Sequence, residues 1–173
     1  MRNDSSIQGG LGRGNPGLCV RKAALFAAFV VLGVPCGAPL AACSQRPAVV
    51  IHTSRETVTV SVEIADTPDK RTTGLMYRRD LAPEAGMLFL FPAASPQKFW
   101  MKNTVLPLDM IFIGPNHKIV GIVADAKPFT TNPQGVDEPS QSVLEVNAGF
   151  AAKHGVAVGD QVEFLRVPDA VAE

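Results

Sequence analysis

From residue 57 onward, the apolar residues of this chain come in short runs that have the length of β-strands. The run TVTVSVEI (57–64) alternates strictly between apolar and polar residues, which is typical of a strand with one buried face. Turn residues separate the later apolar runs at the spacing expected of a small β-barrel or sandwich. Further strands are predicted at 86–92, 97–101, 108–113, 118–126 and 142–146, with a last strand within 156–167.

Two short helices are predicted between these strands. Thr67 can cap the first helix, because Pro68 then occupies the first helical position. Asn147 is expected to cap the second helix, AGFAAKH, which Gly155 ends. Residues 127–140 hold three prolines and are expected to form a surface loop. The prediction is a mainly β (α+β) domain, a small closed or partly open β-barrel of about seven strands with two short helices.

Charge and cysteine content exclude several functions for the part of the chain after residue 43. The chain has 16 basic and 16 acidic residues. Four of the basic residues and one of the acidic residues lie in the first 43 positions, so residues 44–173 hold 12 basic and 15 acidic residues. This acidic excess, without a basic stripe, argues against nucleic acid as a partner. All three cysteines lie in residues 1–43, so the remainder can form no internal disulfide, cysteine zinc site or thiol nucleophile.

The first 43 residues are interpreted as an N-terminal extension and export signal. The apolar run AALFAAFVVLGV (23–34) follows Arg21 and Lys22, and it is shorter than the roughly 20 residues that cross a bilayer. The motif LAAC, which ends at Cys43, matches the bacterial lipobox, in which the cysteine is lipidated and becomes the new N-terminus. The alternative is an ordinary signal peptide, whose cleavage leaves a free periplasmic protein.

We expect an exported protein that is periplasmic or is held at a membrane surface by lipid on Cys43. Ser44 follows the cysteine where an aspartate would resemble an inner-membrane retention signal, which favours the outer membrane. Residues 1–20 are glycine-rich, and translation is expected to begin at Val20. Beyond the signal we expect a tether at 44–56, a single domain at 57–167 and a tail at 168–173.

The stretch FWMKNTVLPLDMIFI (99–113) holds a polar group of residues inside an apolar sequence. Asn103 can shape a turn there, and Asp109 can accept backbone N–H groups, which is the structural interpretation. The functional interpretation is a shallow pocket for a sugar or small carboxylate, with an aromatic face from Trp100 and polar groups from Lys102, Asn103 and Asp109. Arg71 and Arg78 are expected at the rim of this pocket.

Glu145 is the second carboxylate that enters the candidate site. With Asp109 it could form an acid–base pair, which requires the two carboxyl groups to lie roughly 5–10 Å apart across one cleft. Strand alternation offers another interpretation, in which Glu145 meets water or pairs with Lys102 or Arg78. Side chains on opposite faces of the sheet would exclude the catalytic pair.

Other site chemistries find no support in the sequence. The three histidines, His52, His117 and His154, lack metal-ligand spacing, so no metal site is expected. No serine lies in a Gly-x-Ser-x-Gly elbow, and no glycine-rich phosphate loop occurs. We therefore expect no cofactor.

Four segments in order resemble the family called domain of unknown function 192, found in bacteria and archaea. They are GLMYRRDL (74–81), GMLFLF (86–91), FWMKNTVLPLDMIFI (99–113) and VLEVNAGFAAKHGVAVGDQV (143–162). The resemblance covers roughly residues 57–167. It implies a compact β-rich barrel with short helices and no established activity.

The leading hypothesis is a monomeric, non-catalytic envelope module that binds a small polar ligand or an envelope protein. The second is a hydrolase of an envelope glycan that uses Asp109 and Glu145. The third is a structural or assembly factor at the membrane surface, for which a large exposed apolar patch would be evidence.

Overall fold

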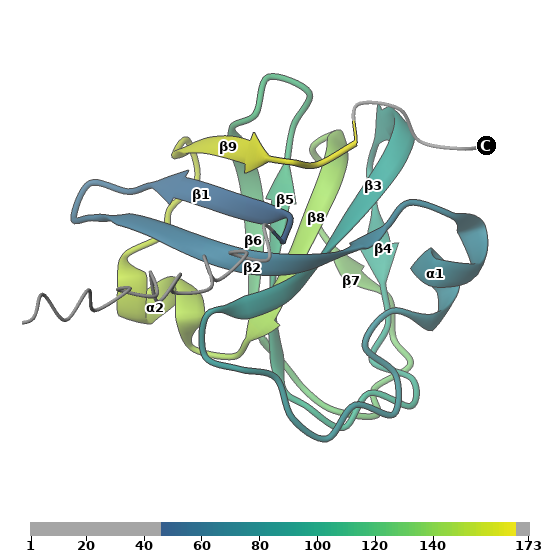
Figure 1. Cartoon of the computed structure of the whole chain (residues 1–173). Helices are drawn as coiled ribbons and strands as arrows, with labels where there is room; N and C mark the ends of the chain where they lie inside the picture. The colour runs from purple at the N-terminus through teal and green to yellow at the C-terminus, as the bar shows by residue number, and fades with distance from the viewer. Residues whose placement is uncertain (1–45, 169–173) are drawn as a thin grey trace, which may run out of the picture. The chain divides into compact units, whose positions relative to one another are not determined.

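The computed structural model describes residues 46–168, which form a seven-stranded sheet, a two-stranded sheet and two short helices (Figure 1). The large sheet has the order β6-β5-β8-β3-β2-β1-β9, in which β2 and β3 are parallel and the other neighbours are antiparallel. The small sheet pairs β4 with β7. The elements are β1 (Ala48–His52), β2 (Thr57–Ala65), α1 (Pro68–Thr73), β3 (Ala85–Ser95), β4 (Lys98–Phe99), β5 (Leu108–Ile113), β6 (Ile119–Ala126), β7 (Gln134–Gly135), β8 (Ser140–Asn147), α2 (Phe150–His154) and β9 (Gln161–Leu165).

The large sheet curls until its two edge strands meet at one end. The amide of Val162 donates to the carbonyl of His117 at 2.8 Å, and the amide of Ile119 donates to the carbonyl of Asp160 at 3.0 Å. A single bridge, between Lys118 and Gln161, joins the edges there. The predicted small, partly open β-barrel with two short helices is therefore confirmed.

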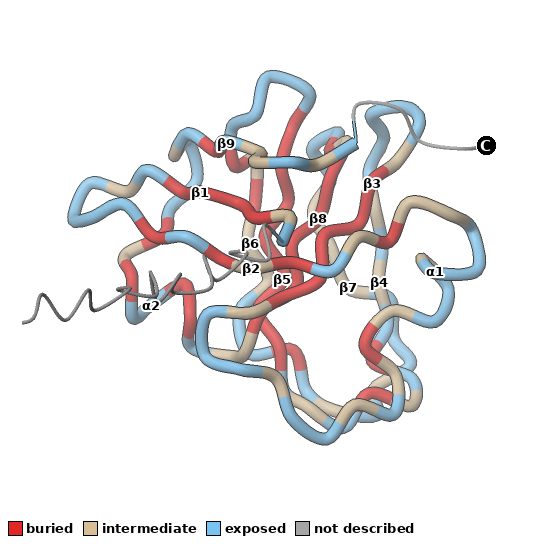
Figure 2. Tube along the Cα trace, viewed as in Figure 1, coloured by how far each residue is buried: buried red, intermediate tan, exposed pale blue. Residues whose placement is uncertain are grey.

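Each face of the curled sheet buries its own apolar cluster, so buried backbone runs through the middle strands (Figure 2). The inner cluster includes Val60, Leu88 and Leu144 and packs against α2. The outer cluster includes Phe89 and Met110 and packs against the segments around α1 and β4. Because both faces of β5 and β8 are covered, these strands are buried almost throughout and do not show simple alternation.

Local capping explains the position of α1. The hydroxyl of Thr67 accepts a hydrogen bond from the amide of Lys70 at 3.3 Å, and Pro68 begins the helix, as predicted. The helix ends at Gly74, whose φ of 48° lies in the region that favours glycine. This short helix connects β2 to β3 and lies over the outer cluster.

Three expectations about the elements were wrong. The tether expected at 44–56 contains β1, which pairs with β2 on one side and β9 on the other. The loop expected at 127–140 contains the two residues of β7, which pair with β4. Asn147 does not cap α2, because its side-chain amide donates to the carbonyls of Leu81 and Ala82. Gly149 occupies the N-cap instead, whereas Gly155 ends the helix as predicted.

The expectations for residues 1–43, including lipidation at Cys43, lie outside the described residues. The two helices of the described part have six and five residues. Neither is long and apolar enough to span a membrane.

Candidate functional site

A pocket of about 210 Å³ lies on the outer face of the sheet, beneath α1 and the turn that follows it. Strands β3 and β8 supply residues from the sheet, and the segment around β4 supplies one side. The lining residues are 71–76, Phe89, Phe91, 97–100, Thr104 and Glu145. Three of the residues that the sequence suggested, Arg71, Trp100 and Glu145, therefore lie in one pocket.

Glu145 is the buried acid of this pocket. It lies on β8 opposite Met87 of β3 and Met110 of β5, on the outer face of the sheet, and only 5% of its surface is exposed. Within residues 46–168, no side chain or backbone group forms a hydrogen bond or ion pair with its carboxyl group. Burial raises the pKa of Glu145 to about 8, so the group is protonated in the empty pocket at neutral pH. Neither Lys102 nor Arg78 pairs with Glu145, in contrast to one alternative from the sequence, because Lys102 lies over Trp100 and Arg78 pairs with Glu63.

Aromatic rings form much of the pocket wall. Phe89 and Phe99 pack edge to face with centroids 5.0 Å apart, and Phe91 meets Phe99 in the same way at 6.3 Å. Phe89 is buried, whereas Phe91 and Phe99 are half-buried and border the opening. The wall therefore presents apolar ring surface next to a buried carboxyl group, which is the usual mixture of a small-molecule site.

Arg71 reaches the pocket from α1 and is fixed by the backbone. One guanidinium nitrogen donates to the carbonyls of Asp66 and Leu90, both at 2.9 Å. The guanidinium also lies 5.5 Å from the centre of the Phe91 ring, within the range of a cation–π contact. No carboxylate of the described chain pairs with Arg71, so its charge is held in place and is free for a ligand.

Trp100 and Lys102 form a pair on the surface beside the pocket. The Lys102 ammonium lies 5.3 Å from the centre of the Trp100 ring, within the range of a cation–π contact. Trp100 lines the pocket and is 48% exposed, whereas Lys102 does not line it. The structure thus places Trp100 at the opening and Lys102 outside it.

Asn103 shapes the turn that follows this pair. Its φ of 57° is left-handed, and its side-chain amide donates to the Tyr77 hydroxyl at 2.8 Å. The backbone carbonyl of Asn103 accepts from the amide of Tyr77 at 2.9 Å. Asn103 therefore joins this turn to the segment after α1, and its side chain does not line the pocket.

Asp109 is fully buried on the other face of the sheet. Its two carboxyl oxygens accept from the amides of Asp125 and Ala151, both at 2.9 Å. In the register of β5 and β8, Asp109 lies opposite Val146 of the inner cluster, whereas Glu145 lies opposite Met110 of the outer cluster. Neighbouring positions along a strand face opposite sides of the sheet, so Asp109 and Glu145 lie on opposite faces. The proposed acid–base pair was therefore wrong.

Arg78 also lies away from the pocket. Its guanidinium pairs with Glu63 of β2, and this hydrogen bond raises the pKa of Arg78. Glu63 lies 15 positions before Arg78 in the chain, so the fold and not the local sequence brings the two side chains together.

The sequence did not identify the aromatic wall or the turn of residues 72–76 as parts of the site. A signal existed for two of the rings. Phe89 and Phe91 occupy alternate positions in GMLFLF, so a β-strand places them on one face. Nothing in the sequence indicated that α1 would leave an opening above that face.

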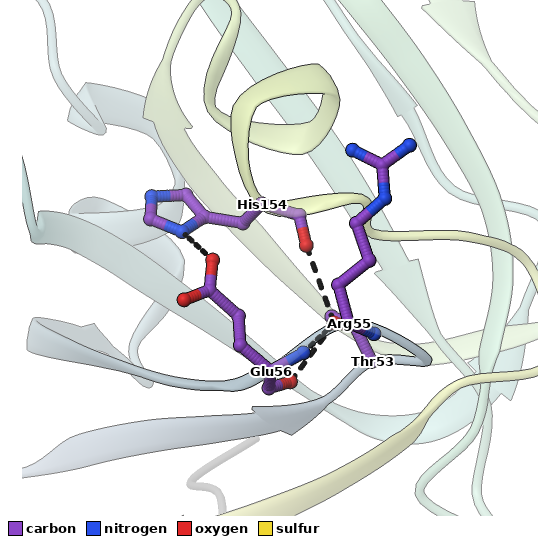
Figure 3. Close-up of polar contacts among 4 residues, drawn as sticks. All are labelled: Thr53, Arg55, Glu56 and His154. Atoms are coloured by element: carbon purple, nitrogen blue, oxygen red, sulfur yellow. Dashed lines mark hydrogen bonds and ion pairs between the residues drawn. The ribbon is translucent and has the colours of Figure 1, made fainter.

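A second polar cluster joins α2 to the turn between β1 and β2 (Figure 3). The Glu56 carboxylate lies 2.7 Å from Nδ1 of the buried His154, and the Thr53 hydroxyl donates to the His154 carbonyl at 3.2 Å. Arg55 lies beside this contact and packs over Gly155. The cluster has a structural role, because it anchors a turn to a helix.

Among residues 46–168, no group of three or more potential metal ligands gathers.

Comparison with known proteins identifies the family. The chain belongs to the DUF192 family, described as "Uncharacterized ACR", whose model matches residues 49–164. The resemblance seen in the sequence is therefore confirmed. No curated protein matches this chain.

Two solved structures resemble the chain closely. A protein of unknown function from Novosphingobium aromaticivorans DSM 12444 is 38% identical, with a TM-score of 0.66, over 67% of this chain and 83% of that protein. A protein from Sinorhizobium meliloti 1021, described as a candidate transcription regulator, is 42% identical, with a TM-score of 0.66, over 70% of this chain and 95% of its own. Both similarities agree with the partly open barrel described above.

Proposed function

We propose that this domain binds a small polar ligand in the pocket between α1 and the outer face of the sheet. The observation that carries the proposal is Glu145, a buried acid without a protein partner at the wall of an aromatic pocket. Burying an ionisable group without a partner destabilises a fold, and such groups concentrate at functional sites. A ligand that contacts Glu145 supplies the missing partner.

The same pocket supports binding better than hydrolysis. Glycoside hydrolysis generally uses two carboxyl groups that flank one bond. Asp109 is committed to two backbone amides on the opposite face, and within the described chain no acid other than Glu145 lines the pocket. A single carboxyl group beside aromatic rings and Arg71 is suited to recognition of a ligand.

A DNA-binding function is not carried over from the Sinorhizobium meliloti protein. The two described helices are short, and residues 44–173 hold more acidic than basic residues. A helix that reads the major groove and a basic surface are the usual elements of sequence-specific DNA binding.

A screen of small molecules by thermal unfolding tests the proposed function. Sugars, nucleotides, carboxylates and amino acids are added to the purified protein and to its Glu145→Gln variant. A specific ligand at 100 times its Kd should stabilise the wild type by about 2.7 kcal/mol and lose most of this effect in the variant. Glu84→Gln, at an exposed position, is the matched control and should behave as the wild type. If no compound stabilises the protein, or if the ligand stabilises Glu145→Gln as much as the wild type, the pocket is not the binding site.

We also propose that the domain is exported and anchored by lipid on Cys43. The short apolar run at 23–34 and the LAAC motif support this placement. Cells that produce the protein should incorporate labelled palmitate into it, and Cys43→Ala should abolish the label. A labelled Cys43→Ala variant, or an unlabelled wild type, would contradict the anchor.

A further inference from the structure

Among residues 46–168, two ionisable groups of the pocket, Arg71 and Glu145, form no ion pair, and they lie apart along β3. The Arg71 guanidinium lies over Phe91, whereas Glu145 is paired across the sheet with Met87. Met87 and Phe91 are four positions apart on β3, a distance of about 13 Å at 3.3 Å per residue. Arg71 and Glu145 both line the same pocket, so a cation and an acid face one space from positions that are separated along β3.

An apolar wall separates these two groups. Phe89 lies midway between Met87 and Phe91 on the same face of β3, and Phe99 packs against it. This wall offers no charge to a ligand. It suits the methylene groups of a ligand, and ring faces also attract a nearby ammonium group.

The third charged group of the pocket already forms an ion pair. Lys98 donates to the Asp137 carboxylate at 3.0 Å and to the carbonyl of Val136 at 3.3 Å. The charges available to a ligand are therefore those of Arg71 from α1 and Glu145 from β8. A ligand anion would form charge-assisted hydrogen bonds with Arg71, and a ligand cation would do so with Glu145.

We infer that the pocket recognises a zwitterion, whose ammonium group meets Glu145 and whose carboxylate meets Arg71, with an apolar chain along Phe89 between them. This inference rests on the proposed function and specifies the class of its ligand. A simple amine would leave Arg71 unpaired near a second positive charge. A simple anion would leave Glu145 without a partner.

Binding of such a ligand releases a proton. In the empty pocket, burial raises the pKa of Glu145 to about 8, so the protonated form predominates at pH 7. An ammonium group beside the carboxyl group favours the ionised form, so the O–H bond breaks and its proton passes to the buffer.

Three matched compounds test the inference by isothermal titration calorimetry of the purified protein. They are 6-aminohexanoate, hexanoate and hexylamine, which carry both charges, the anion alone and the cation alone. We expect 6-aminohexanoate to bind at least tenfold more tightly than either of the others. Titrations at pH 7 in buffers of different ionisation enthalpy should show release of close to one proton per bound ligand.

Variants separate the two ends of the ligand. Glu145→Gln should abolish proton release and remove the advantage of 6-aminohexanoate over hexanoate. Arg71→Gln should remove the tighter binding of 6-aminohexanoate relative to hexylamine and leave proton release intact. Arg79→Gln, at an exposed position outside the pocket, is the matched control for charge.

The outcomes distinguish this inference from the proposed function. Failure of 6-aminohexanoate to bind more tightly than both single-charge compounds would overturn the zwitterion. A Glu145→Gln variant that keeps the full advantage of 6-aminohexanoate over hexanoate would do the same. If an uncharged sugar binds instead and Glu145→Gln abolishes that binding, the proposed binding pocket is supported and the inferred zwitterionic ligand is contradicted. If no compound of the wider screen stabilises the protein, the proposed function itself fails.

Discussion

Glu145 gives the stability of this domain a pH dependence whose sign can be stated. Its folded-state pKa of about 8 exceeds the ordinary value of 4.5, so the folded chain holds the proton more tightly than the unfolded chain. The resulting stabilisation is complete below pH 4.5 and is lost as the pH rises through 8. Within this window, the loss is at most about 1.4 kcal/mol for each pH unit.

A glutamine at position 145 should remove this pH dependence, because it is similar in shape and does not titrate. Between pH 5 and pH 8, we expect the free energy of unfolding of the wild type to fall by about 3 kcal/mol relative to Glu145→Gln. Urea unfolding at several pH values measures the difference, with Glu84→Gln as the control that follows the wild type. A constant difference across this range would show that Glu145 is ionised at neutral pH.

At the same scale, the sequence predicted the identity of several site residues better than their surroundings. Glu145 lies on the face opposite Leu144, as alternation along the strand sequence SVLEV predicts. It could not show that α1 and β4 would cover that face, because that cover comes from segments distant in the chain. The role of Asn103 in a turn, in contrast, could be predicted from its residue type alone.

At the scale of elements, Asp109 connects three pieces of structure. Its side chain leaves β5, accepts from Asp125 in β6 and accepts from Ala151 in α2. Asp109→Asn replaces one acceptor oxygen with a donor group, which faces a backbone N–H. We expect a loss of about 2–4 kcal/mol in the free energy of unfolding, measured in urea.

The exposed Asp80→Asn serves as the control for this substitution and should change stability little. An Asp109→Asn variant as stable as the wild type would indicate that the two amides find other acceptors.

Element boundaries were predictable where local chemistry decides them. Thr67 and Pro68 begin α1, and Gly155 ends α2, at the positions that the sequence indicated. The strand β7 was missed because its two residues form a strand only through pairing with the remote β4. The strand β1 had a local signal, the apolar run AVVI that precedes β2, but its residues were assigned to a tether. Asn147 was misassigned as a cap because the carbonyls of Leu81 and Ala82 compete for its side chain.

At the scale of the whole molecule, turn spacing was sufficient to predict a small barrel but not how far it closes. Closure depends on the contacts of Ile119 and Val162 with the opposite edge, which no local pattern encodes. The DUF192 match at residues 49–164 also begins within β1, in agreement with the observed start of the sheet. The fold was therefore more accessible from sequence than the pocket, which lies where covering segments meet.

The position of α1 between two parallel strands has a consequence for amide hydrogen exchange. A parallel pair needs a crossover connection, and here that connection also covers the pocket, while Glu145 comes from a strand much later in the chain. The two ends of the pocket are therefore assembled from sequence-distant segments that meet only in the folded sheet. A bound ligand should slow exchange at the amides of the largely buried strands β3 and β8 as well as near the pocket.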